Sequence, residues 1–173
     1  MDEGGVCEWA WSDGEGVDKA QRRYGAPVIR YYEYRVMPRM FEQRQMVLSK
    51  RDAEVVLVLR RPSGFYLLHC KVFYPQGLYR LLSGGIDRGE ALLHAAEREV
   101  REETGLGAQT ERFLAIQRHV FRCGDQAAPF TSYLLLMAGE TGTPHPQDDD
   151  EAISEFREVP LEALLGVAEA LEG

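Results

Sequence analysis

The stretch from Gly84 to Leu106, GGIDRGEALLHAAEREVREETGL, constrains this chain more than any other part of it. Its second half predicts a helix, on which Glu99, Glu102 and Glu103 stand at i, i+3 and i+4. Their carboxylates therefore share one face, within an arc of about 100°. Three like charges this close repel one another. Mg²⁺ or Mn²⁺ would remove the repulsion, because both ions prefer hard oxygen ligands.

The flanking residues indicate how this helix begins, ends and packs. Gly105 stands where a C-cap glycine belongs, and Ser83-Gly84-Gly85 permits a tight turn from a preceding strand. Glu90 suits the positive end of the helix dipole, and Arg98 can pair with Glu102 or reach back to Glu90. An apolar stripe predicts the face that docks on a sheet, and it comprises Leu92, Leu93, Ala96 and Val100.

A run of glutamates alone is most often a solvated helix face, so the complete spacing has to decide. Nine positions of the stretch match by residue type, which at average residue usage happens by chance in about one such chain in a million. The stretch resembles the signature box of the Nudix hydrolases at every motif position, namely Gly84, Glu90, Arg98-Glu99-Val100, Glu102-Glu103 and Gly105-Leu106. The resemblance implies an α/β/α sandwich with a mixed sheet between helices. It also implies Mg²⁺-dependent hydrolysis of a diphosphate linked to a nucleoside or similar group.

The resemblance assigns Glu99, Glu102 and Glu103 as metal ligands. A backbone carbonyl at Gly84 is expected to be a further ligand, because glycine allows close approach to an ion. Mg²⁺ is the expected cofactor and Mn²⁺ the alternative. Such ions neutralise phosphate oxygens and lower the pKa of a bound water.

The attacking water also needs a base, and several carboxylates compete for that role. One ligand, Glu99 or Glu103, is the first candidate. In many relatives an acidic residue of a later loop reaches the metals, which here favours Glu151 and then Glu155. Arg98 is also expected to be needed for catalysis, because it would hold the loop and the helix together. A direct contact of Arg98 with phosphate is the less favoured alternative.

Substrate contacts are expected just before the box and in a later strand. Arg80 would point towards the metal site and contact phosphate, and Tyr79 and Phe121 are candidates to stack on a base. A core role is the alternative for both rings. Within the box, Glu90 and Gly105 are expected to be structural.

Subfamily marks of the ADP-ribose, diadenosine and coenzyme A hydrolases are missing. The expected substrate is therefore a class: a nucleotide sugar, ADP-ribose or a dinucleotide. Three alternatives stay open, namely a nucleoside triphosphate pyrophosphohydrolase, a Nudix-like domain that senses a nucleotide without cleaving it, and an interaction module.

Chain length, net charge and cysteine content limit the kinds of molecule that this protein is expected to bind. The chain has 173 residues and a net charge of −8, which fits one domain and argues against nucleic acid or an anionic membrane as partner. Its three cysteines share no metal-like spacing and predict reduced thiols in a cytoplasmic protein. No apolar run reaches membrane-spanning length.

The chain divides into three expected segments. Residues 1–26 are glycine-rich and acidic and are expected to be mobile, or ordered only against a partner. Residues 27–50 are expected to form a β extension with strands at 28–36 and 44–50. It would serve either a homodimer contact or as an added edge on the same sheet. Residues 51–173 are expected to form the catalytic domain, where strands alternate with two helices. Its strands are expected near 53–59, 65–73, 112–121, 130–138 and 153–159.

Overall fold

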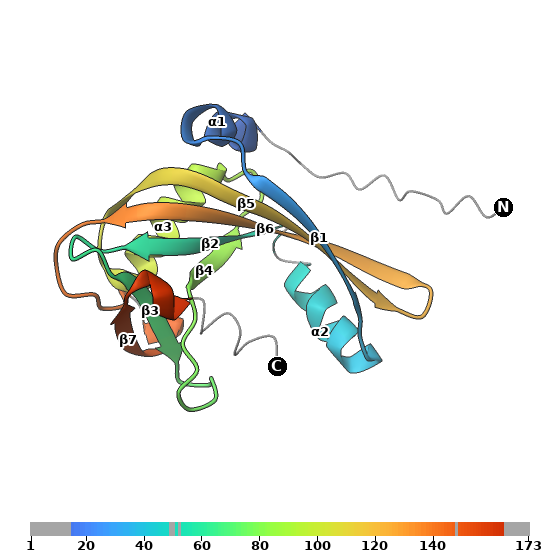
Figure 1. Ribbon diagram of the computed structural model, residues 1–173. Helices are drawn as coiled ribbons and strands as arrows, with labels where there is room; N and C mark the ends of the chain where they lie inside the picture. The colour runs from blue at the N-terminus through green and yellow to red at the C-terminus, as the bar shows by residue number, and fades with distance from the viewer. Residues whose placement is uncertain (1–14, 49–50, 52, 148, 165–173) are drawn as a thin grey trace.

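The computed structural model describes residues 15–48, 51, 53–147 and 149–164, where one mixed β-sheet carries helices on both faces (Figure 1). Its seven strands within these residues are β1 Val28–Arg35, β2 Ala53–Arg60, β3 Tyr66–Lys71, β4 Leu82–Ile86, β5 Ala108–Cys123, β6 Gln126–Gly139 and β7 Ile153–Val159. The helices that flank it are α1 Glu15–Tyr24, α2 Pro38–Leu48 and α3 Leu92–Thr104. The expected sandwich, with its mixed sheet, is confirmed.

The strands run in the order β1-β5-β6-β2-β3-β7, and β4 also pairs with β2. The β1–β5 and β2–β6 pairs are parallel and the other pairs are antiparallel. Strand β2 lies at the centre because its run of valines and leucines suits a pleated, buried surface. Its alternate residues Val55, Leu57 and Leu59 are fully buried against the main core.

Two hydrophobic clusters occupy opposite faces of the sheet. The larger one lies under α1 and α3 and includes Ile116 of β5, whereas the smaller one lies under α2 and includes Phe121 of the same strand. Phe121 follows Ile116 by five positions, an odd number, along a regular stretch of β5, so their side chains point to opposite faces.

The segment before β2 contains a helix where a second strand was expected. Strand β1 forms as predicted and pairs with β5 as an added edge of the sheet. Residues 38–48 then form α2, so the expected strand at 44–50 is wrong as far as Leu48. Pro38 occupies the first helical position, which suits its restricted φ, and the methionines, glutamines and arginines that follow favour helix. Phe41 anchors α2 in the smaller cluster and is only 2% exposed.

The N-terminal segment is also more ordered than expected where the structure describes it. Residues 15–24 form α1, whose residues Val17 and Ala20 are buried in the main core. The helix approaches α3 so closely that a Cβ at Gly16 would lie 3.1 Å from the backbone nitrogen of Leu92. The prediction for residues 1–14, including Cys7, lies outside the described residues.

Two further expectations can be compared with the structure. Cys70 and Cys123 are free cysteines, and their reduced state in the cell stays a prediction. In the described part of the chain, no helix has the length and apolar character needed to cross a membrane.

Candidate active site

Helix α3 brings the three glutamates of the box to the edge of β4. Glu99 and Glu103 are buried, at 7% and 0% exposure, while the side chain of Glu102 is 44% exposed. The helix ends at Gly105, whose φ of 69° is left-handed and whose N–H donates to the carbonyl of Arg101 at 2.8 Å. The expected C-cap role of Gly105 matches this geometry.

Gly84 is required because the carboxyl group of Glu99 lies directly over it. A Cβ added at Gly84 would lie 1.7 Å from Cδ of Glu99. Gly84 and Gly85 are paired residues of β4, opposite Val55 and Glu54 of β2. The expected strand-to-helix turn at these glycines is therefore wrong, because the chain turns later, between Ile86 and Leu92.

Arg98 connects the loop before α3 to the carboxylates on it. Its Nε and Nη2 each lie 2.8 Å from a carboxylate oxygen of Glu90, and Nη2 donates to the carbonyl of Gly85 at 2.9 Å. Its Nη1 donates to both Glu99 and Glu102 at 2.8 Å. These contacts join the loop that carries Glu90 to the helix that carries Glu99 and Glu102.

Glu103 is held between β4 and β3. One carboxylate oxygen accepts the N–H of Ser83 at 3.2 Å. The other, Oε1, lies 3.2 Å from Nζ of Lys71 and 3.6 Å from Nδ1 of His69, without an aligned hydrogen bond to either. Two residues of β3 therefore face the carboxylate that the sequence assigns to the metal.

The later acidic loop reaches this cluster through Lys71. A short 3₁₀ turn, Asp149–Glu151, places Oε2 of Glu151 at 3.1 Å from Nζ of Lys71. Glu155, the second candidate from that region, instead lies 3.7 Å from Arg157 and is exposed. Of the two later carboxylates, Glu151 is the one that a shared ion pair connects to Glu103.

Burial changes the acidity of the box carboxylates. Burial raises the pKa of Glu103 to about 8, against the opposing charge of Lys71, and it also raises the pKa of Glu99 against the hydrogen bond from Arg98. Both groups are therefore expensive to ionise unless a cation lies beside them. Burial also lowers the pKa of His69, to about 4, so His69 is neutral near pH 7.

The carboxylate oxygens of the box suit a hard divalent ion, although they do not yet converge on one position. Glu99, Glu102 and Glu103 offer only carboxylate oxygens, and Oε1 of Glu103 is a buried acceptor without a hydrogen-bond donor. Among the described residues, no three acidic, histidine or cysteine side chains already surround one ion position. Protein cations, Arg98 and Lys71, lie against these carboxylates instead.

Of the three residues expected to bind substrate, only some lie near the carboxylate cluster. Arg80 is exposed and its backbone pairs with His69, which puts it beside the carboxylate cluster. Tyr79 is buried, and its hydroxyl accepts a hydrogen bond at 2.7 Å from Arg157, whose guanidinium covers the ring. Phe121 packs under α2 on the other face of the sheet. Both rings are buried, at 6% and 8% exposure, which fits the core role named as the alternative.

Two residues that contact Glu103 were not among the expected site residues. Lys71 and His69 lie two positions apart on β3, so the period of a strand puts both side chains on the same face. The sequence signal for Lys71 is a basic residue on the strand before the box. The signal is weak, because isolated lysines most often lie on the surface.

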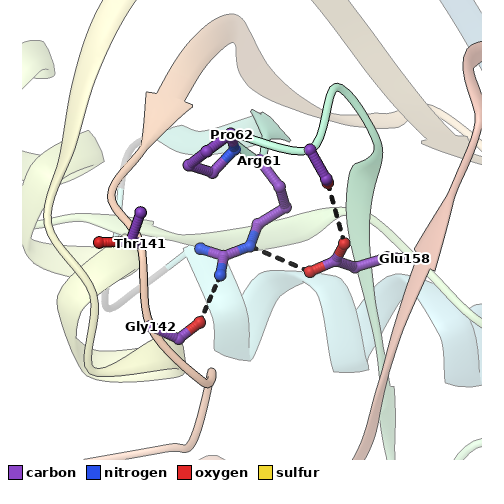
Figure 2. A pocket seen from close by; sticks show the side chains of 6 residues that line it. Arg61, Pro62, Thr141, Gly142 and Glu158 are labelled. Atoms are coloured by element: carbon purple, nitrogen blue, oxygen red, sulfur yellow. Dashed lines mark hydrogen bonds and ion pairs between the residues drawn. The ribbon is translucent and has the colours of Figure 1, made fainter.

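A small cavity elsewhere in the fold is not part of this cluster. It has a volume of about 170 Å³ and is lined by Arg61, Pro62, Ser63, Thr141, Gly142 and Glu158 (Figure 2). Arg61 spans it, donating to Glu158 at 3.1 Å and to the carbonyls of Glu140 and Gly142. These contacts lie at the end of β2 remote from Glu54 and Gly85. Arg61 therefore joins loops and is not available to a phosphate.

Comparison with known proteins agrees with this fold and box. The NUDIX domain family matches residues 47–172. A NUDIX hydrolase from Nitrosomonas europaea superposes with a TM-score of 0.52 at 19% identity, covering 69% of this chain and 79% of that one. A MutT NUDIX hydrolase from Burkholderia pseudomallei gives 0.51 at 20% identity, covering 65% and 85%. No curated protein matches.

A sandwich of this topology, with a complete box on the helix beside β4, defines a Nudix pyrophosphohydrolase. The chain belongs to the NUDIX domain family, which matches most of its length.

Proposed function

We propose that the protein hydrolyses a phosphoanhydride bond in a nucleoside diphosphate linked to another moiety, with Mg²⁺ as cofactor and Mn²⁺ as an alternative ion. The observation that carries the proposal is the arrangement around β4. Two buried carboxylates, of Glu99 and Glu103, lie against Gly84 and the N–H of Ser83. Burial raises the pKa of both even beside Arg98 and Lys71, and a divalent cation would offset that cost.

In this proposal Glu99, Glu102 and Glu103 hold the metal, with the carbonyl of Gly84 as a further ligand. The metal supplies charge neutralisation at the phosphate oxygens and a more acidic water. Arg98 keeps two of the carboxylates oriented through its contacts to Glu99 and Glu102. It acts as a positioning residue, because its remaining donors are taken by the loop.

The proton of the attacking water goes to a carboxylate near Glu103. Glu151 is our preferred base, because its loop brings it within 3.1 Å of the same lysine that contacts Glu103. Its side chain is 23% exposed, more than those of Glu99 and Glu103, so a proton can leave from it to solvent. Glu99 and Glu103 are the alternatives.

Phosphate recognition is assigned to Arg80, which lies on the strand segment paired with His69. The substrate class remains a nucleotide sugar, ADP-ribose or a dinucleotide, and a nucleoside triphosphate is the second candidate. We also propose that residues 51–173 form the catalytic domain and 27–50 an extension of it, and that the enzyme acts in the cytoplasm. A homodimer remains a prediction.

The test is a substrate panel with product analysis. Purified protein is incubated with nucleotide sugars, ADP-ribose, dinucleoside polyphosphates and nucleoside triphosphates, with Mg²⁺, with Mn²⁺ and with a chelator. We expect metal-dependent cleavage of one diphosphate-linked class, with slower cleavage of triphosphates. Faster turnover of triphosphates would replace the proposed substrate class, and no turnover of any compound with either ion would favour the sensing domain.

A further inference from the structure

Lys71 lies between two carboxylates that come from different parts of the chain. Its Nζ is 3.2 Å from Oε1 of Glu103 on α3 and 3.1 Å from Oε2 of Glu151 in the later loop. The side chains of the two acids are 0% and 23% exposed, and that of Lys71 is 17% exposed. A single ammonium group therefore joins the buried end of the cluster to its solvent side.

The protein thus carries its own cations at the acidic cluster. Arg98 contacts Glu90, Glu99 and Glu102, and Lys71 contacts Glu103 and Glu151. Burying Glu103 as an anion without a partner would be costly, so Lys71 stabilises its charged form before any metal arrives. The ammonium and a divalent ion cannot both occupy the position next to Oε1 of Glu103.

We infer that Lys71 is a tethered cation that the divalent metal displaces from Glu103 and Glu151. The inference rests on the proposed function, because it takes Glu103 as a metal ligand. Lysine suits this role because its ammonium is a point charge on a flexible four-carbon stem that can withdraw without moving the backbone. Arg98, by contrast, is locked by its bidentate contact to Glu90 and stays in place.

Two consequences distinguish this role from simple structural pairing. The metal must break two ion pairs of Lys71 to bind, so the native site binds metal more weakly than its carboxylates alone would. The ammonium that leaves also becomes more accessible to solvent. A lysine that only supports the fold would stay in its ion pairs and would gain no accessibility when metal binds.

The first measurement is Mg²⁺ affinity by titration calorimetry, without substrate, for wild type, Lys71→Met and Arg80→Met. Methionine keeps the length of the lysine stem and removes its charge. We expect Lys71→Met to bind Mg²⁺ about 3- to 10-fold more tightly than wild type. Arg80→Met removes an equal charge nearby, from a guanidinium that lies over Tyr74, and controls for the general field. Its affinity should stay within about twofold of wild type.

The second measurement needs no variant. The chain has three lysines, Lys19, Lys50 and Lys71, so an amine-reactive reagent followed by peptide mass spectrometry reports each one separately. We expect labelling of Lys71 to rise severalfold when Mg²⁺ is added, relative to the exposed Lys19, and not when NaCl of equal ionic strength is added.

The outcomes separate this inference from the proposed function. If Lys71→Met binds Mg²⁺ no more tightly than wild type, or no more tightly than Arg80→Met, Lys71 does not compete with the metal. Unchanged labelling of Lys71 at saturating Mg²⁺ overturns the displacement in the same way. Wild-type protein that binds no Mg²⁺ at all contradicts both the inference and the proposed function.

Discussion

Arg98 and Glu90 form a bidentate ion pair in which Nε and Nη2 of the arginine each lie 2.8 Å from a different carboxylate oxygen. The planar guanidinium matches the carboxylate, which makes this kind of contact strong and directional. Glu90 also accepts the N–H of Asp87 at 3.1 Å. One ion pair therefore fastens the loop that follows β4 to the helix that carries the proposed metal ligands.

Acid is expected to weaken this fastening. Hydrogen bonds from Arg98 lower the pKa of Glu90 from 4.5 to about 2, against the effect of burial. The folded protein therefore binds fewer protons at Glu90 than the unfolded chain does. The stabilisation is fully present above the unfolded value of 4.5 and is lost as the pH falls towards 2.

Urea unfolding between about pH 5 and pH 2.5 checks this prediction. Wild type should lose more free energy of unfolding over this range than Glu90→Gln, by on the order of 1–3 kcal/mol. Glu97→Gln, an exposed position on the same helix, should decline in parallel with wild type. A parallel decline of Glu90→Gln would show that the pair contributes no pH-dependent stability.

The space over Gly84 gives a second prediction. Gly84→Ala would drive its Cβ into the carboxylate of Glu99, which would have to leave its position. We expect metal-dependent turnover to fall by roughly 100-fold, because small displacements of catalytic groups are costly. Ser83→Ala is the matched control, since it keeps the backbone N–H that Glu103 accepts. Equal activities of the two variants would mean that Glu99 needs no such placement.

The docking of α2 gives a third prediction. Phe41 is 2% exposed and packs with Phe121 and Phe130, whereas Met40 beside it is 53% exposed. Phe41→Ala should lower the free energy of unfolding by about 3 kcal/mol, and Met40→Ala by less than about 0.5 kcal/mol. Chemical denaturation measures both values. A small loss of unfolding free energy in both variants would contradict the docking of α2 through Phe41.

Much of the catalytic half was predictable because its signals are local. The apolar run at 53–59 and the spacing of Glu99, Glu102 and Glu103 each indicate a single element. The N-terminal part was predicted less well. In residues 38–48 the favourable helix propensity and the N1 position of Pro38 compete with an apolar run that suggests a strand, and the contact of Phe41 with Phe121 is long-range.

The site shows the same division. The shared face of Glu99, Glu102 and Glu103 follows from helix geometry, but the contacts of Lys71 to Glu103 and Glu151 join β3, α3 and a later loop. Contacts between residues so far apart in the sequence leave no spacing pattern from which they could be predicted. The burial of Phe121 was equally hidden, because its partner Phe41 lies on a helix that the sequence pattern did not indicate.

The central claim is that the carboxylates of α3 hold a metal that drives hydrolysis, and Glu102→Gln tests it most directly. The side chain of Glu102 is 44% exposed, so its replacement by glutamine should leave the fold intact. With the best substrate of the panel, we predict that Mg²⁺-dependent turnover falls by at least about 100-fold in Glu102→Gln, as for loss of a transition-state contact. Turnover should stay near wild type in Glu97→Gln, on the same helix. Wild-type turnover in a folded Glu102→Gln protein would contradict the metal-ligand assignment.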